Sequence, residues 1–290
     1  MTPDTRARIE LALGSRIVKS TPVAGGDINE AERIDLLDGR QAFVKTNLNA
    51  PRGMFPAEAI GLQWLKAANV IRLPEVYAVC GDAATGQAAF LVLEWIGQGC
   101  PAQDFDERLG RALAQLHQTI AGSFGFNSNN FIGSLPQDNS EKSSWSEFYW
   151  TRRLEPQVRR AASSGKLEPS TVHAFDKLSL RLAEYYGTAE PPARLHGDLW
   201  GGNLHIDSGG SPCLIDPAVY GGHREMDLGM MRLFGGFSPR VFWAYAECYP
   251  LLPGYEERVV LAQLYPLLVH VNLFGGGYAT SVKRGVERYL

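Results

Sequence analysis

The stretch RLHGDLWGGN at positions 194–203 places several groups that could carry out chemistry within ten residues. Asp198 and Asn203 lie five residues apart, His196 precedes the aspartate, and a second aspartate, Asp216, follows in CLIDPA. Carboxylate and amide oxygens are ligands that suit Mg²⁺, and a carboxylate can also accept a proton from a hydroxyl group. Because glycine, aspartate and asparagine also dominate surface turns, the stretch alone indicates either a turn or a site.

Phosphoryl transfer from ATP needs a cation at the phosphates, oxygen ligands for Mg²⁺ and a carboxylate at the acceptor hydroxyl. Kinases supply a strand lysine, a helix glutamate that holds it, a catalytic-loop aspartate, an asparagine five residues later and a second metal-binding aspartate. This chain has candidates for all of them in the same order: Lys45, Glu58, Asp198, Asn203 and Asp216. The order predicts Asp198 as the catalytic base and Asn203 and Asp216 as Mg²⁺ ligands, although a lone strand lysine or helix glutamate is usually a solvated surface residue.

A glycine-containing loop, AGGDIN (24–29), lies between the first two expected strands. Gly25 and Gly26 are its candidate nucleotide-binding residues, but the loop has fewer glycines than the full G-x-G-x-x-G pattern. A plain hairpin loop explains it equally well. The chain has no G-x-S-x-G hydrolase motif and no H-E-x-x-H zinc motif, so these enzyme classes are not indicated.

The first third of the chain contains the elements that would position Lys45 and Glu58. Thr2 and Pro3 predict a helix start and Gly14 its end. Alternating segments at 15–23, 30–37 and 40–47, the last two joined by Asp38-Gly39, predict three antiparallel strands with Lys45 near the end of the third. A helix is expected over 56–69, with Glu58 on the same face as core leucines, which predicts a cation partner for this acid. Two more strands are expected at 74–81 and 88–96.

The remainder has mostly helical periodicity. We expect helices near 106–120, 145–163, 168–186, 225–235, 238–248 and 255–274, with a short hairpin between Asn203 and Asp216. The predicted fold class is α+β, a two-lobed protein-kinase-like fold with a small antiparallel β-sheet lobe plus one helix and a larger, mainly helical lobe. The predicted domains are a nucleotide-binding lobe at 1–95 and a catalytic and substrate lobe at 96–290.

Composition narrows the possible partners. The net charge is −3 and the pI is near 6.1, so no nucleic-acid partner is expected. No run of eighteen apolar residues predicts a membrane span, and the N-terminal residues lack the apolar core of a secretory signal. The four cysteines have no CxxC spacing, which argues against structural zinc and favours reduced thiols in the cytoplasm.

Several segments together resemble the fructosamine kinase, or ketosamine-3-kinase, family, which is related to aminoglycoside phosphotransferases and choline kinases. The catalytic stretch HGDLWGGN resembles that of the family, including its tryptophan. The resemblance extends over most of the 290 residues, through AFVK (42–45), MFPAEAIGL (54–62), FGFNSNNFIGSLPQDN (124–139), DPAVYGGHREMDLGM (216–230), LFGGF (233–237) and NLFGGGY (272–278).

The resemblance implies ATP-dependent phosphorylation of the sugar 3-hydroxyl of a ketosamine, on a small amine or a protein. The phosphorylated adduct then breaks down and frees the amine, which amounts to deglycation. It further implies ATP and Mg²⁺ as cofactors, Lys45 as the phosphate-binding lysine and Glu58 as its partner. Adenine would meet the backbone of LEWI, that is Glu94, Trp95 and Ile96, and Asp227 would support the catalytic loop.

Two other functions remain open at the level of sequence. A kinase for an aminoglycoside, choline or another small alcohol would share the site residues. A pseudokinase scaffold would normally lack the lysine, the base or a metal acid, all of which are present. We also expect Trp145 as a candidate wall of the sugar pocket, His223 as a brace for the following helix, and a looser segment around Gly221 and Gly229. The sequence does not fix the oligomeric state.

Overall fold

The computed structural model describes residues 1–290 apart from 24–28, 82–87 and 187–189. The candidate glycines Gly25 and Gly26 therefore lie outside the described residues. The chain forms two compact units: one comprises Met1–Phe105 and Leu204–Pro217, the other Asp106–Asn203 and Ala218–Leu290. This division differs from the expected domains because the connector up to Phe105 and the hairpin after Asn203 both belong to the first unit.

The first unit is built on a five-stranded antiparallel sheet in the order β1-β2-β3-β5-β4. The strands are β1 Ile17–Pro22, β2 Glu30–Leu36, β3 Gln41–Asn47, β4 Val76–Cys80 and β5 Ala89–Glu94. The hairpin at Asp38-Gly39 is confirmed: Gly39 has φ +88°, a conformation that glycine adopts without steric cost. All five strands that the sequence predicts are present.

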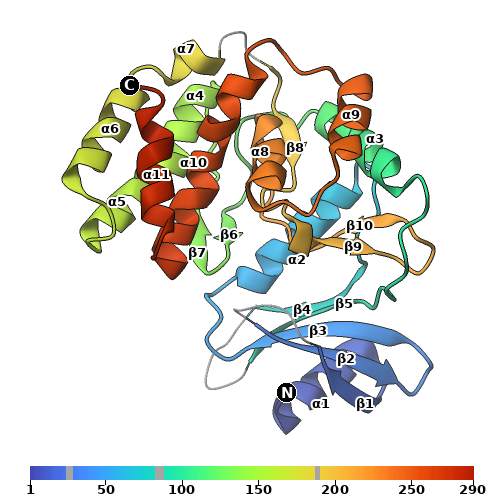
Figure 1. Ribbon diagram of the computed structural model, residues 1–290. Coiled ribbons are helices and arrows are strands. Elements are labelled where there is room, and N and C mark those ends of the chain that lie inside the picture. The colour runs from blue at the N-terminus through green and yellow to red at the C-terminus, as the bar shows by residue number, and fades with distance from the viewer. Residues whose placement is uncertain (24–28, 82–87, 187–189) are drawn as a thin grey trace. The chain divides into compact units, whose positions relative to one another are not determined.

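Two helices lie on opposite faces of this sheet (Figure 1). Helix α1 (Pro3–Leu13) begins at Thr2, whose hydroxyl accepts the Thr5 N–H, and ends at Gly14 in the left-handed conformation. Its Ile9 packs in a buried cluster with side chains such as Val44 of β3. Helix α2 (Met54–Lys66) covers the other face, the one toward which Lys45 points because successive strand residues alternate.

The hairpin of β9 (Leu204–Ile206) and β10 (Pro212–Leu214) is fastened to the first unit by Arg72. The guanidinium of Arg72 donates to Asp207 in the hairpin at 2.7 Å and to Glu94 at the end of β5 at 2.8 Å. The backbone of Arg72 also forms a β-bridge with Cys213. These long-range contacts explain why the hairpin belongs to this unit, which sequence distance alone does not indicate.

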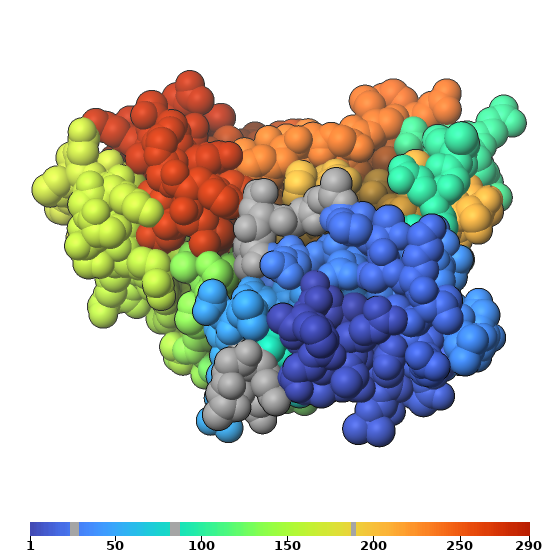
Figure 2. Space-filling view, turned by 90° about the horizontal axis from the view of Figure 1, so that it is seen from below, coloured from blue at the N-terminus to red at the C-terminus, as the bar shows by residue number. Residues whose placement is uncertain are grey.

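The second unit is mainly helical. Its helices are α3 Phe105–Gln118, α4 Trp145–Phe148, a π-helix at Tyr149–Leu154, α5 Glu155–Ser163, α6 Pro169–Ser179, α7 Leu182–Tyr186, α8 Glu225–Phe234, α9 Pro239–Cys248, α10 Tyr255–Phe274 and α11 Tyr278–Glu287. Short strands complete it: β6 Asn130–Ile132, β7 Leu135–Gln137, β8 Ala193–Leu195 and β11 Tyr220–Gly222. Helices α5 and α6 lie beside α10 and α11, as the yellow-green and red atoms of Figure 2 show. Among the described residues, no helix is both long and apolar enough to cross a membrane.

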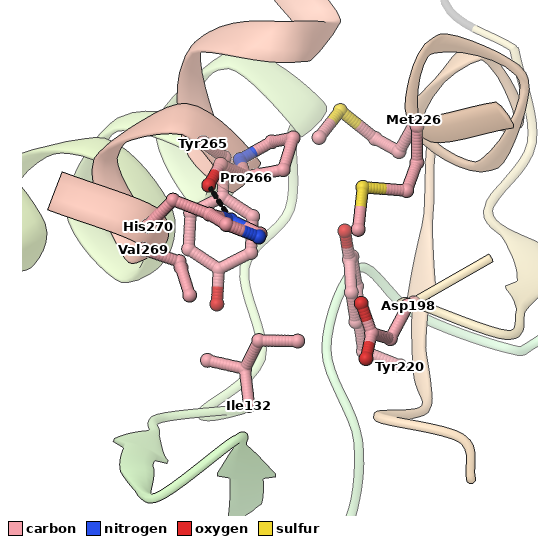
Figure 3. Close-up of a pocket in the computed structure, with 10 residues that line it drawn as sticks. Ile132, Asp198, Tyr220, Met226, Tyr265, Pro266, Val269 and His270 are labelled. Carbon is pink, nitrogen blue, oxygen red and sulfur yellow. Dashed lines mark hydrogen bonds between the residues drawn. The ribbon is translucent and has the colours of Figure 1, made fainter. Parts of the chain in front are cut away.

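Helix α10 is the central helix of the second unit. Most of its side chains are buried, and it packs against α8, α11 and α5. The approach to α8 is close, since a Cβ at Gly229 would lie 2.8 Å from the Cβ of Ala262. One side of α10 instead lines an open pocket, toward which Tyr265, Val269 and His270 point (Figure 3).

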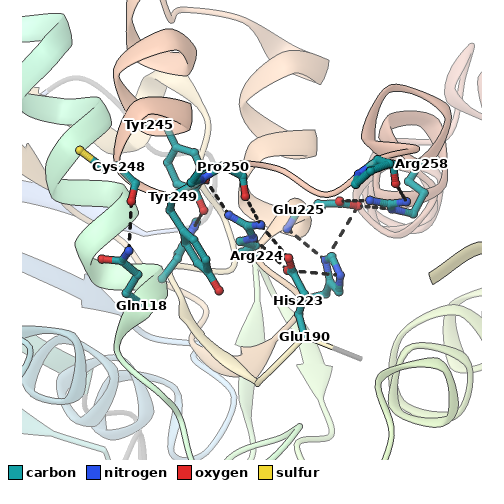
Figure 4. A network of polar contacts seen from close by, with 12 residues as sticks. Gln118, Glu190, His223, Arg224, Glu225, Tyr245, Cys248, Tyr249, Pro250 and Arg258 are labelled. Atoms are coloured by element: carbon teal, nitrogen blue, oxygen red, sulfur yellow. Dashed lines mark hydrogen bonds and ion pairs between the residues drawn. The ribbon is translucent and has the colours of Figure 1, made fainter. Parts of the chain in front are cut away.

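A network of buried charges joins the start of α8 to segments before α7's successor strand and after α9 (Figure 4). Arg224 donates two hydrogen bonds to Glu190, at 2.6 and 2.9 Å, and Arg258 donates two to Glu225, at 2.6 and 2.8 Å. His223 lies between the pairs: its Nδ1 accepts the N–H of Glu225 at 3.4 Å and its Nε2 is 3.6 Å from Glu190. The expectation that His223 braces the following helix is confirmed.

Burial of His223 should make the stability of the protein sensitive to mild acid. Burial, opposed by Glu190, lowers the pKa of this imidazole from 6.5 to about 4. In the unfolded chain the ring binds a proton below about pH 6.5, whereas in the folded protein it stays neutral. The free energy of unfolding should therefore fall as the pH drops from 6.5 to about 4, by up to about 3 kcal/mol from this group.

Urea unfolding of the wild type and of His223→Gln across this range measures the effect. The variant should show a flatter pH dependence, because the titrating ring is gone while the carboxylates around it remain. His173→Gln, a change at an exposed position of α6, is the matched control and should follow the wild type. Equal slopes for His223→Gln and the wild type would contradict the assignment.

Candidate active site

The loop after β8 has a shape that only glycine permits at its second residue. Gly197 has φ +82°, and a Cβ there would lie 2.0 Å from the carbonyl oxygen of Ala218. The N–H of Ala218 in turn donates to the carbonyl of His196 at 2.9 Å. The loop that carries Asp198 is therefore pressed directly against the segment leading into β11.

Asp227 of α8 holds this loop in place. Its side chain is 1% exposed, and its two oxygens accept the N–H groups of His196 at 2.8 Å and Gly197 at 2.9 Å. His117, at the end of α3, lies 3.2 Å from the same carboxylate through Nε2. Burial alone would raise the pKa of Asp227, but these hydrogen bonds and the nearby imidazoles keep it below its usual range. The carboxylate is thus ionised and structural, as the sequence predicts.

His117 is a supporting residue that the sequence analysis missed. Its Nδ1 lies 2.9 Å from the hydroxyl of Tyr245 in α9, so a chain of hydrogen bonds runs from α9 through α3 to the catalytic loop. The available signal was a lone histidine on the buried stripe of a helix, which a core residue explains equally well. His196 braces the loop as expected, since its Nδ1 accepts the N–H of Asp198 at 3.3 Å.

Asp198 and Asn203 are brought together by a 3₁₀ turn at Gly201–Asn203. The amide nitrogen of Asn203 donates to the backbone oxygen of Asp198 at 2.8 Å and to its carboxylate at 3.2 Å. With its amide nitrogen turned toward Asp198, the remaining side-chain atom of Asn203 is a carbonyl oxygen, the type of ligand that suits Mg²⁺.

Asp198 lies in the wall of the pocket on the second unit (Figure 3). Aromatic, thioether and aliphatic side chains form most of the remaining wall, chiefly Tyr220, Met226, Tyr265, Val269 and His270. A carboxylate beside a mostly apolar pocket is the arrangement expected where a base meets an organic acceptor.

The lysine and its two acids form the other group of site residues, within the first unit. The Nζ of Lys45 lies 2.7 Å from Glu58 of α2 and 2.6 Å from Asp216, which follows β10. Burial would lower the pKa of Lys45, but the charges of Asp216 and Glu58 outweigh it and raise the pKa above its ordinary value. The cation partner expected for Glu58 is therefore Lys45. Asp216 has φ +55°, an uncommon conformation for a residue with a side chain and one that marks functional positions.

The expected adenine-binding segment follows β5. The carboxylate of Glu94 is engaged by Arg72 and by the N–H of Glu75 at 3.3 Å, so only its backbone is a candidate for the nucleotide. The ring of Trp95 packs 6.5 Å from that of Phe43, and Ile96 is buried. The side chains of this segment thus serve the first unit rather than the outside.

Two expectations about the acceptor region are wrong. Trp145 is 5% exposed and stacks on Tyr149 at 5.1 Å within the core, so it is not a wall of the pocket beside Asp198. The segment around Gly221 is tight rather than loose: a Cβ there would lie 2.2 Å from the carbonyl oxygen of Ser123, and Gly229 is equally close to α10. Both glycines allow close packing, which the sequence alone could not reveal.

The donor atoms fit a metal that arrives with a nucleotide better than a permanently bound one. Within the described parts of the chain, no group of three or more histidine, cysteine or acidic side chains could hold a metal ion. Mg²⁺ commonly binds through one or two protein carboxylates and completes its shell with water and phosphate oxygens. Asp216 and Asn203 supply the oxygen ligands that such binding requires.

Comparisons with known proteins agree with this chemistry. The fructosamine kinase family matches residues 1–290. A probable ketoamine kinase of Enterococcus faecium is 37% identical over 97% of this chain and 97% of its own length. A chloroplastic protein-ribulosamine 3-kinase of Oryza sativa subsp. japonica is 38% identical over 95% of this chain and 80% of its own.

Solved structures support the same assignment and the fold. A candidate fructosamine-3-kinase from Thermobifida fusca superposes with a TM-score of 0.90 at 38% identity, covering 100% of this chain and 99% of that one. An aminoglycoside phosphotransferase, solved with AMP-PNP and hygromycin B, has a TM-score of 0.63 at 14% identity over 98% of each chain, which extends to the fold alone. The predicted α+β, two-lobed kinase-like fold is confirmed, and this chain belongs to the fructosamine kinase family.

Proposed function

We propose that the protein transfers the γ-phosphoryl group of ATP to the 3-hydroxyl of the sugar in ketosamines, such as ribulosamine or fructosamine adducts of lysine or other amines. Membership of the fructosamine kinase family supports the substrate class. The observation that carries the chemistry is the position of Asp198, a carboxylate in the wall of a mostly apolar pocket on a loop fixed by Asp227. Breakdown of the phosphorylated adduct would then free the amine.

In this proposal each site residue has one task. Asp198 orients the sugar hydroxyl and accepts its proton, while Lys45, held by Glu58, contacts the phosphates. Asn203 and Asp216 hold Mg²⁺, which neutralises charge on the phosphates when bound. Because the transition state of phosphoryl transfer is loose, positioning by these groups should contribute more than proton abstraction.

The nucleotide base is assigned to the segment after β5. Backbone groups of Glu94 and Ile96, on either side of Trp95, would hydrogen-bond adenine, and Gly25 and Gly26 would approach the phosphates. All four cysteines have free thiols, in keeping with a reducing compartment such as the cytoplasm.

A matched acceptor panel tests the proposed function. ADP release is measured with Mg²⁺ and ATP against ribulose-lysine, fructose-lysine, the free amine, an aminoglycoside and choline. Turnover should be confined to the ketosamines. Turnover of the aminoglycoside or choline alone would instead establish a different small-molecule kinase, and nucleotide binding without turnover of any acceptor would favour a pseudokinase.

Replacement of the base should separate chemistry from binding. Asp198→Asn keeps the shape of the side chain but removes its ability to take a proton, and a general base contributes about 10²–10⁴-fold to a rate. We expect kcat for the ketosamine to fall by about that factor while the Kd for nucleotide stays close to that of the wild type. Near-normal kcat in this variant would show that Asp198 is not the base.

Replacement of Asp216 should affect the metal–nucleotide complex. Asp216→Asn is the conservative change, since asparagine tolerates the left-handed backbone found there. Calorimetry should show Mg²⁺–nucleotide binding weakened by about tenfold to a hundredfold, the scale of a charge-assisted contact. With EDTA present the weakening should vanish, because a negative charge beside Lys45 has been removed. Asp176→Asn, an exposed change on α6, is the control, and equal loss with and without Mg²⁺ would count against a metal-binding role.

A further inference from the structure

His270 lies in the pocket wall across from Asp198, and the roles given above to the site residues leave it without a task (Figure 3). It is on the side of α10 that carries Tyr265 and Val269, four residues after Pro266. The edge of its ring points toward the opening that Asp198 faces from the other side. A group bound beside Asp198 would therefore meet this ring edge.

The hydrogen bonding of the ring determines what it can offer. Nδ1 lies 2.8 Å from the carbonyl oxygen of Pro266, and a carbonyl only accepts, so Nδ1 carries the proton. Burial lowers the pKa of His270, which favours the neutral ring. Nε2 then has a lone pair and acts only as an acceptor. Among the described residues, no side chain or backbone group donates to Nε2.

Three aromatic side chains fix the direction of this lone pair. The ring of His270 lies 4.5 Å from that of Phe234 in α8, 5.0 Å from Tyr278 in α11 and 5.4 Å from Phe274 in α10, between ring centres. Rotation of the imidazole would break these contacts as well as the bond to Pro266. The acceptor is thus held in place before any ligand binds.

The charges around the pocket favour a donor that carries a positive charge. Of the described residues that line the pocket, only Asp198 is formally charged, and no lysine or arginine is among them. Arg153 is fully buried behind the lining and stacks on Tyr220, 3.9 Å from its ring centre. Its charge reduces the attraction of that ring for a cation. Recognition of a cationic group must then come from Asp198 and from the lone pair of His270.

We propose that His270 is a specificity-determining residue whose Nε2 accepts a hydrogen bond from the protonated amine nitrogen of the ketosamine. The assignment rests on the proposed function, since it concerns the acceptor of that reaction. In a ketosamine the amine nitrogen is only a few bonds from the 3-hydroxyl, so one molecule can present its hydroxyl to Asp198 and its N–H to His270. A free ketose lacks this donor, and His270 therefore selects sugars that are attached to an amine.

The test combines a change in the protein with a change in the ligand. The ligands are fructose-lysine and its ether analogue, in which oxygen replaces the amine nitrogen and removes both the donor and the charge. The variants are His270→Phe, which keeps a ring among the neighbouring aromatics, and His270→Gln, which keeps an acceptor near the position of Nε2. Thermal unfolding of each variant checks that the fold is retained.

For His270→Phe we expect kcat/KM for fructose-lysine to fall by about tenfold to a hundredfold, the scale of a hydrogen bond to a charged group. The loss should lie mainly in KM, because the contact is made equally in the ground state and the transition state. The ether analogue should be a poor substrate of the wild type and should lose almost nothing in the variant. His270→Gln should recover much of the activity on fructose-lysine.

Wild-type turnover of fructose-lysine is measured first, because it tests the proposed function by itself. If the wild type fails on every ketosamine, the proposed function falls and the His270 assignment falls with it. If the wild type succeeds but His270→Phe loses the same factor on both ligands, the function stands and the assignment is overturned, since the ring would then contact the sugar or act only structurally.

Discussion

The arrangement of the catalytic loop depends on one buried carboxylate, that of Asp227. An ionised carboxylate that is 1% exposed is costly unless hydrogen bonds replace its water, and here two backbone N–H groups and His117 do so. The same bonds remove the freedom of the backbone immediately before Asp198. Because Asp227 also begins α8, whose close contact with α10 is permitted by Gly229, the catalytic loop is positioned by the packing of two long helices.

The chemistry of the site could largely be predicted from the sequence, because phosphoryl transfer requires particular residue types in a particular order. The Lys45–Glu58 pair and the Asp198–Asn203 contact both lie where the order predicts them. His117 and His270 could not be predicted, since each is an isolated histidine on an apolar helix face, a pattern that any core would produce. Only the position of a carboxylate or a pocket next to such a ring distinguishes it. The catalytic roles themselves stay predictions.

The fold was predictable to the extent that it depends on local signals. The Thr2 cap, the turn at Gly39 and the alternation around Lys45 each specify a short segment, and all three are confirmed. Contacts distant in sequence carried no such signal. The hairpin 204–214 belongs to the first unit through Arg72, a residue more than a hundred positions earlier, and Trp145 is buried in the core because neighbouring aromatics surround it. Burial of this kind is decided by the whole chain.

The charges on the first unit connect nucleotide binding to metal binding. A buried lysine needs partners, and Lys45 has two carboxylates, so the group formed by Lys45, Glu58 and Asp216 has a net charge of −1. A triphosphate that approached this group without a metal would meet net repulsion. A divalent cation at Asp216 changes the sum to +1 and makes the same group attractive to phosphate. The fixed residues alone therefore favour the metal–nucleotide complex over the free nucleotide, and this selectivity comes from the placement of Asp216 beside Lys45.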